Sequence, residues 1–346
     1  MTSPGPPWRS PGAPPRVPPD RRGPIGPAAD PVGSAPITVV IEIIAPIFGI
    51  VLAGWLAARL KAFDESATRG LSLFAFNFAI PVFLLRTVAQ TELPPHSDWQ
   101  FVFAYFGGAF TVFALGALAG RFLFAQHGAA PAIFGISACF SNTTILGIPI
   151  VLRAFGDAAA VPLALILGFH SALLFTLTTV VAEIGAGVGV PLRELARNVI
   201  RGLVTNPILW GIAGGLALNG LDLALPAMVD QFAALLGGSA LPTALFALGS
   251  NLSRFHLTRT IREALLLTVL KILVQPAAIY ALGAWVFGLG RTSLAVATTM
   301  AALPTGINAY LFAARYDRAT PEASSTILIS TVLSTITVAA LLALWR

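Results

Sequence analysis

The chain has 346 residues, of which 56% are hydrophobic and 10% are charged, and its mean hydropathy is +0.82. So few charged side chains cannot cover a water-soluble protein of this length, which excludes a soluble globular fold and predicts an integral membrane protein. The net charge of +6 comes from basic residues in short loops rather than one basic patch, so we expect no nucleic-acid partner. The single cysteine, Cys139, excludes an intrachain disulfide and a cysteine-based zinc site.

Residues 1–36 form a proline-rich segment that holds 12 of the 26 prolines. The segment contains no apolar run of the length that a secretory signal peptide needs. Proline at this density, with few large apolar side chains, predicts a disordered tail with polyproline II character. The remaining alternative for this tail is an arm that binds a partner through its prolines and arginines.

Residues 37–346 are expected to form ten transmembrane helices, so the predicted fold class is all-α membrane. Each apolar segment is close to the ~20 residues that cross about 30 Å of hydrocarbon as a helix. The period-two alternation of a membrane barrel is missing from these segments. The expected spans are 37–58, 67–88, 99–123, 131–152, 160–182, 203–220, 228–249, 264–287, 293–314 and 323–345.

The orientation follows from the lysines and arginines, which gather in cytoplasmic loops. One set of alternate loops holds 12 of them and the opposite set holds 4, while the four tail arginines oppose this bias. We therefore expect both termini on the non-cytoplasmic side. The segment 186–202, between the fifth and sixth spans, is then a short cytoplasmic linker.

An internal repeat relates residues 37–185 to residues 198–346, so the expected five-helix repeats are 37–185 and 203–346. An offset of 161 residues places Pro46 on Pro207, Gly54 on Gly215 and Pro81 on Pro242. Because five spans are an odd number, two five-helix repeats must have opposite orientations in the membrane. Inverted repeats are a transporter architecture, since exchanging the conformations of two similar halves gives alternating access.

The fourth span of each repeat contains residues that interrupt a helix near the middle of the membrane. Proline removes a helical hydrogen-bond donor, and glycine lets the backbone leave helical geometry. The resulting half-helix N-termini carry partial positive charge that suits an anionic group. The alternative is a pair of proline kinks repaired by neighbouring helices. The candidate substrate-binding residues are Asn142, Thr143, Gly147 and Pro149 in the first break, and Pro304, Thr305, Gly306 and Asn308 in the second.

These motifs resemble the auxin efflux carrier family, which includes plant PIN carriers and bacterial permeases for malate and malonate. The resemblance covers nearly all of residues 37–346. Its motifs are Phe-Ala-Ile-Pro-Val-Phe-Leu-Leu at 78–85, Ser-Asn-Thr-Thr-Ile-Leu-Gly-Ile-Pro-Ile at 141–150, Thr-Asn-Pro-Ile-Leu-Trp-Gly at 205–211, Ala-Leu-Phe-Ala-Leu-Gly-Ser-Asn-Leu at 244–252, Lys-Ile-Leu-Val-Gln-Pro at 271–276 and Ala-Leu-Pro-Thr-Gly-Ile-Asn-Ala at 302–309.

The resemblance implies a crossed-helix fold, similar to bile-acid symporters and sodium/proton antiporters. Spans 1, 2, 6 and 7 would form a scaffold, often homodimeric, and the other six spans a moving transport domain. Substrate carboxylates would bind where the broken helices cross, which carries over to Asn142, Gly147 and Pro149, and to Pro304 and Asn308. The proline-rich tail departs from the family pattern.

Lys271 lies within the eighth expected span, where a buried amine is costly enough to indicate a function. It would supply a positive charge beside the crossing, either attracting the anion or replacing a coupling cation. Alternatively, it extends to the cytoplasmic interface. The four histidines fit no metal spacing, and no nucleophile, base and metal set is present, so we expect no metal, no cofactor and no enzyme activity.

The sequence thus predicts a secondary transporter in the bacterial inner membrane that moves a small organic anion, such as a mono- or dicarboxylate, across the lipid bilayer. One alternative is a sodium-coupled symporter of the same fold. Another is a membrane receptor or assembly subunit that transports nothing and uses the proline-rich tail as an interaction arm.

Overall fold

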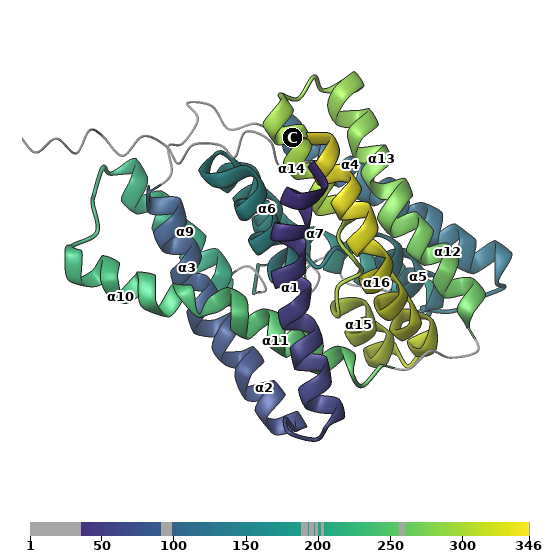
Figure 1. The fold of residues 1–346 in the computed structure, drawn as a ribbon. Helices are drawn as coiled ribbons and strands as arrows, with labels where there is room; N and C mark the ends of the chain where they lie inside the picture. Colours follow the sequence, from purple (N-terminus) through teal and green to yellow (C-terminus); the bar gives the residue numbers. More distant parts are fainter. Residues whose placement is uncertain are drawn as a thin grey trace, which may run out of the picture. The chain divides into compact units, whose positions relative to one another are not determined.

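The fold is taken from a computed structural model, shown in Figure 1. The structure describes residues 36–90, 99–187, 193, 197, 200–201, 204–255 and 260–345, with side chains from Ile44 onward. In this part of the chain all regular elements are helices, and one isolated β-bridge is present. The predicted all-α class is therefore confirmed. The predicted disordered tail and most of the predicted linker lie outside the described residues.

Helices of the first half follow the expected segments. They are α1 (Pro36–Arg59), α2 (Glu65–Phe74), η1 (Ala75–Ala79), α3 (Ile80–Gln90), α4 (Trp99–Leu118), η2 (Ala119–Leu123), α5 (Ala130–Cys139), η3 (Thr143–Gly147), α6 (Ile148–Phe155), η4 (Gly156–Ala159) and α7 (Ala160–Gly185). Asp64 caps the start of α2 by accepting the Ala67 N–H at 2.7 Å, and this hydrogen bond holds the pKa of the Asp64 carboxyl below its usual value.

The second half of the described chain is also helical. Its helices are α9 (Pro207–Gly220), α10 (Ala227–Gly238), α11 (Ala240–Leu252), α12 (Ile261–Val269), η5 (Leu270–Val274), α13 (Gln275–Ala281), η6 (Leu282–Val286), α14 (Arg291–Ala302), α15 (Asn308–Tyr316) and α16 (Thr320–Trp345). The elements η1 and η5 are single π-helical turns inside longer helices, whereas η3 begins the helix that continues into α6, and η2 and η6 end the helices of α4 and α13.

Six continuous helical stretches in the described part of the chain are long and apolar enough to cross a membrane. Ten were expected, and the difference has identifiable causes. The interruptions at 140–142 and 303–307 leave α5, α14 and α15 shorter than a span, α9 has only 14 residues, and α1 is counted only over Ile44–Arg59. The integral membrane class is supported by these helices, while ten membrane crossings stay a prediction.

Two groups of helices can be distinguished by their packing. In the scaffold group, α1 runs along α11, and α3 packs on both α9 and α10 (Figure 1). An ion pair of 2.8 Å between Arg86 Nε and Asp230 Oδ1 also joins α3 to α10. In the crossing group, α5 packs on α4 and α7, and α13 packs on α4 and α14, with α16 against α12. The groups meet where α1 contacts α6 and α16, and where α11 contacts η3.

Glycines allow the closest approaches inside the scaffold group. A Cβ atom at Gly54 would collide with the carbonyl of Phe246, and a Cβ at Gly215 would collide with the carbonyl of Leu85. Gly54 and Gly215 differ by 161 residues, and so do Leu85 and Phe246. Both the α1–α11 contact and the α3–α9 contact join the first half to the second, and the offset relates one contact to the other.

Contacts between helix ends join segments that the sequence places on the same side of the membrane. Arg254, after the seventh expected span, pairs with Glu65, after the first, at 2.9 Å. The Tyr316 hydroxyl, at the end of the ninth span, donates to the Glu183 carboxylate, at the end of the fifth, at 3.0 Å. All four residues belong to the side with the larger number of basic residues.

Candidate substrate site

The two interrupted helices meet at their breaks. The segment 140–142 separates α5 from η3, and the segment 303–307 separates α14 from α15. Ser141 and Thr305 form an antiparallel β-bridge. The Asn142 N–H donates to the carbonyl of Pro304, and the Gly306 N–H donates to the carbonyl of Phe140, both at 2.9 Å. The breaks therefore satisfy each other's backbone groups where no helix can do so.

Thr305 is hydrogen-bonded to two other helices, once through its backbone and once through its side chain. Its N–H donates to Ser330 Oγ of α16 at 3.0 Å, and its hydroxyl donates to the carbonyl of Ser137 in α5 at 2.8 Å. Both partners are fully buried, as is Ser141 on the other strand of the bridge. These bonds hold the second break against α5 and α16.

The bridge requires a glycine at position 306. A Cβ atom there would lie 2.8 Å from Cδ1 of Phe140 and 3.4 Å from the Ser141 carbonyl oxygen. The distance to the aromatic ring is shorter than real Cβ contacts allow, and a side chain at 306 would push the two segments apart. The predicted site residue Gly306 thus acts through close backbone approach.

The predicted residues separate into two sets by location. Six of them lie in or beside the bridge: Asn142, Thr143, Pro304, Thr305, Gly306 and Asn308. Gly147 and Pro149 lie farther along the helix, where a Cβ at Gly147 would meet Met300 Sδ at 2.7 Å and Pro149 occupies the first turn of α6. The helix is already continuous from Thr143 through the π-helical turn η3, so Pro149 lies inside it and removes one hydrogen-bond donor without ending it.

Asn142 and Asn308 stand at the N-terminal ends of the helices that leave the crossing. Asn142 precedes η3, and Asn308 is the first residue of α15. No side-chain cap is formed at either helix start, and Asn142 is 7% exposed. Two helix N-termini, each carrying partial positive charge, therefore begin at the crossing with an amide side chain beside each.

The opposite helix ends are covered by one helix of the crossing group. Gln275 Nε2 donates to the carbonyl of Cys139, the last residue of α5, at 2.9 Å. Lys271 Nζ, one turn earlier, donates to the carbonyl of Ala301 near the end of α14. Both side chains are fully buried, so the alternative in which Lys271 extends to the interface is wrong. The functional role of Lys271 stays a prediction.

Three further buried polar residues lie near the crossing, and two of them, Gln275 and Ser330, were not expected there from the sequence. His170 of α7 lies with its ring centroid 4.5 Å from that of Phe140, and Gln275 and Ser330 bond directly to the broken segments. Each is a buried polar residue inside an apolar span, and this property is the signal that could have found them. Their contacts with the breaks could not have been predicted, because they come from other spans.

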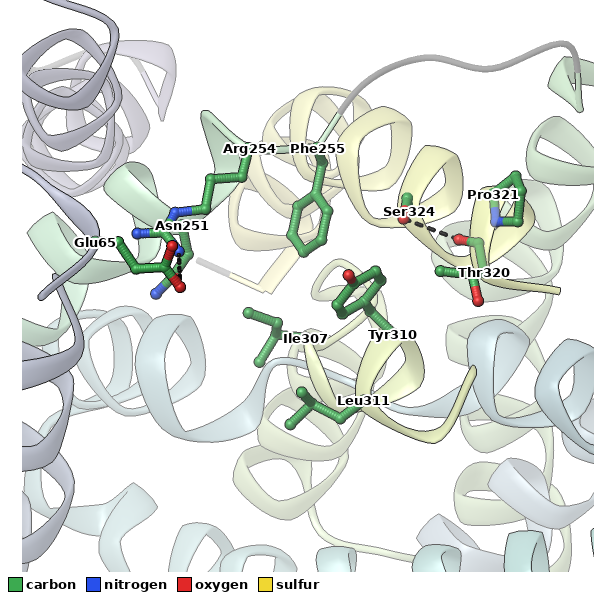
Figure 2. A pocket seen from close by; sticks show the side chains of 10 residues that line it. All are labelled: Glu65, Asn251, Arg254, Phe255, Ile307, Tyr310, Leu311, Thr320, Pro321 and Ser324. Atoms are coloured by element: carbon green, nitrogen blue, oxygen red, sulfur yellow. Dashed lines mark hydrogen bonds and ion pairs between the residues drawn. The ribbon is translucent and has the colours of Figure 1, made fainter. Parts of the chain in front are cut away.

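A pocket of about 530 Å³ opens beside the crossing, between the scaffold and crossing groups (Figure 2). Asn251 and Arg254 of the scaffold side face Ile307 and Tyr310 across it, with Ser324 of α16 beyond them. Ile307 directly precedes Asn308, so the pocket leads to the second break. Its size lies within the range of small-molecule sites.

The described residues contain no cluster of three or more histidine, cysteine or acidic side chains that would hold a metal ion. The site consists of helix ends, amides, hydroxyls and one ammonium group. Groups of these kinds suit a small anion, through hydrogen bonds and partial charges.

A comparison with protein families identifies residues 39–342 as a membrane transport protein domain, Mem_trans. The chain belongs to this family. It is a membrane transporter of the auxin efflux carrier family and not an enzyme, which confirms the resemblance found in the sequence.

Three relatives illustrate the range of the family. The chain is 29% identical to the "Putative malonate transporter" of Rhizobium meliloti (strain 1021), over 89% of this chain and 96% of the relative. It is 25% identical to auxin efflux carrier component 8 of Arabidopsis thaliana, over 80% of this chain and 89% of that carrier. It is 26% identical to the lysosomal cholesterol signaling protein of Mus musculus, over 70% of this chain but 30% of that protein.

Proposed function

We propose that this transporter moves a small organic anion, a mono- or dicarboxylate, by alternating access, and that the anion binds at the helix crossing. The observation that carries the proposal is the arrangement of Asn142 and Asn308 at two uncapped helix N-termini on either side of one bridge. The name of the Rhizobium meliloti relative, a malonate transporter, agrees with a carboxylate substrate.

In the proposed site, the carboxylate accepts hydrogen bonds from the amides of Asn142 and Asn308 and from Thr143 near the start of η3. The two helix dipoles stabilise its charge without a fixed cation in direct contact. The Pro304–Gly306 segment supplies a rigid wall, since its backbone and the Thr305 side chain are already hydrogen-bonded to the protein. Gly147 supports the proposed site indirectly, because its lack of a Cβ atom allows η3 to pack against Met300.

Alternating access is supported by the paired contacts of the scaffold group. The equivalent Gly54–Phe246 and Gly215–Leu85 approaches favour two inverted five-helix repeats, 37–185 and 203–346. We propose that the crossing group moves against the scaffold group and that the pocket beside Arg254 is the opening on the cytoplasmic side. Placement in a bacterial inner membrane, non-cytoplasmic termini and a homodimer through the scaffold helices belong to this proposal.

A binding screen tests the proposed function. The purified protein is unfolded by heat with malonate, malate, acetate or an indole carboxylate, and with malonamide as the uncharged control. A bound carboxylate raises the unfolding midpoint by mass action, and malonamide should not. If no carboxylate raises the midpoint of the wild-type protein at millimolar concentration, the proposed substrate class is wrong.

Two alternative functions can be distinguished from the proposed one by measuring flux. A sodium-coupled symporter of the same fold would require sodium for flux into proteoliposomes. A receptor role is favoured by the mouse relative, which is named a signaling protein. Deleting residues 1–34 separates a receptor that acts through this tail from a transporter, because the transporter should keep its flux without the tail.

A further inference from the structure

Lys271 and Gln275 together cover the C-terminal ends of both broken helices. They lie four residues apart, Lys271 within η5 and Gln275 at the start of α13, and so occupy one face of a helix. The amide reaches the last carbonyl of α5, and the ammonium reaches the carbonyl of Ala301 in α14. One helix thus donates hydrogen bonds to the two helix ends that point into the crossing.

The charges at these ends explain why a lysine is stable here. A helix C-terminus carries a partial negative charge, and a cation beside it is stabilised. Lys271 is fully buried, and no carboxylate of the described residues lies within ion-pair distance of it. Its positive charge is therefore compensated by backbone carbonyl dipoles rather than by an acidic side chain.

The helices around η5 also carry three buried oxygens that have no hydrogen-bond partner in the described residues, and the Lys271 ammonium is hydrogen-bonded to none of them. The buried oxygens Ser137 Oγ in α5, Gln275 Oε1 in α13 and Thr299 Oγ1 in α14 accept or donate no hydrogen bond within the described residues. The helices that carry them, α5, α13 and α14, all pack against η5. Carbonyl and hydroxyl oxygens at half-helix C-termini are the groups that coordinate a monovalent cation in transporters with broken helices.

We propose that the Lys271 ammonium is a resident cation at this position. It takes the place that a bound sodium ion occupies in cation-coupled transporters of this general design, so the protein needs no monovalent cation to stabilise its crossing. The anion is held at the two helix N-termini and the resident cation at the two helix C-termini. The inference deepens the proposed function, because the stabilised crossing is the proposed substrate site.

The test removes the ammonium and offers a replacement. Lys271→Ala leaves a cavity of the shape of n-propylammonium, and Lys61→Ala is the matched control, since the chain has two lysines and Lys61 is exposed. Both variants and the wild-type protein are purified at full length and unfolded by heat. The salts are n-propylammonium chloride, sodium chloride and the chloride of N-methylglucamine, a cation too large for the cavity.

We expect the midpoint of Lys271→Ala to fall and to recover by at least about 3 °C in n-propylammonium or sodium, in a saturable way. The midpoints of the wild-type protein and of Lys61→Ala should not depend on the cation. A specific sodium response of the wild-type protein, or a Lys271→Ala variant that responds to neither small cation, overturns the proposal.

A second variant covers the case in which Lys271→Ala does not fold. Lys271→Met removes the charge but keeps an apolar stem of similar length, and we expect it to be recovered when sodium is present throughout purification. Failure to recover either variant in any small cation also counts against the proposal. Because the measurement uses no substrate, a negative carboxylate screen would overturn the proposed function and leave this result standing.

Discussion

Asn142 and Asn308 are the residues whose side chains have the most direct part in the proposed site. Hydrogen bonds to a charged group contribute about 1.5–3 kcal/mol each, so replacing either residue with alanine should weaken carboxylate binding roughly 10- to 100-fold. Titration of the purified variants by thermal stabilisation measures this change. Asn77→Ala is the matched control, because Asn77 is an exposed asparagine of the scaffold group. Wild-type affinity in both crossing variants would contradict the site.

Gly306 makes a different prediction, since it contributes packing and no polar group. Gly306→Ala places a methyl group against the Phe140 ring, and such overpacking costs typically about 1–3 kcal/mol. We expect a lower unfolding midpoint together with weaker carboxylate binding, because the bridge itself is displaced. Gly49→Ala is the control, as a Cβ there meets nothing within 4 Å. A Gly306→Ala protein as stable as the control would show that the two breaks do not touch.

Helix packing in the scaffold group depends on glycines that let two helix backbones approach each other closely. Gly54→Leu and Gly215→Leu each insert a side chain where a carbonyl of the partner helix lies. If the two contacts are equivalent by repeat symmetry, the two variants should lower the unfolding midpoint to a similar extent. Circular dichroism during heating measures both. A large loss for one variant and none for the other would argue against equivalent packing at the two contacts between the halves.

Much of this element-scale architecture could be predicted from hydropathy and from proline and glycine positions. The sequence correctly predicts that the fourth span of each repeat is interrupted. The first interruption, however, falls at residues 140–142, and it leaves Gly147 and Pro149 inside a helix. The helix continues through Pro149, and the break forms where the backbones of Phe140 and Asn142 find partners in the second broken helix. Pairing between segments about 160 residues apart leaves no local signal, and neither does the contact of Thr305 with Ser330.

At the scale of the whole molecule, the pocket beside the crossing must open to one side of the membrane. Leu311 lines it and is 53% exposed, whereas Gly290 lies at the start of α14, after the eighth expected span. In a Cys139→Ser background, a membrane-impermeant thiol reagent should label Leu311→Cys from the cytoplasmic side and Gly290→Cys from the other. Labelling of both from the same side would contradict the predicted orientation.

Substrate transport through the helix crossing is most directly tested by counterflow of radiolabelled malonate in proteoliposomes. Vesicles loaded with unlabelled malonate should accumulate the label when they contain the wild-type protein, and the Asn142→Ala/Asn308→Ala double variant should lose at least about nine tenths of the initial rate. The Asn77→Ala protein should match the wild type. Accumulation by the double variant at the wild-type rate would contradict a carboxylate site at the crossing of the two broken helices.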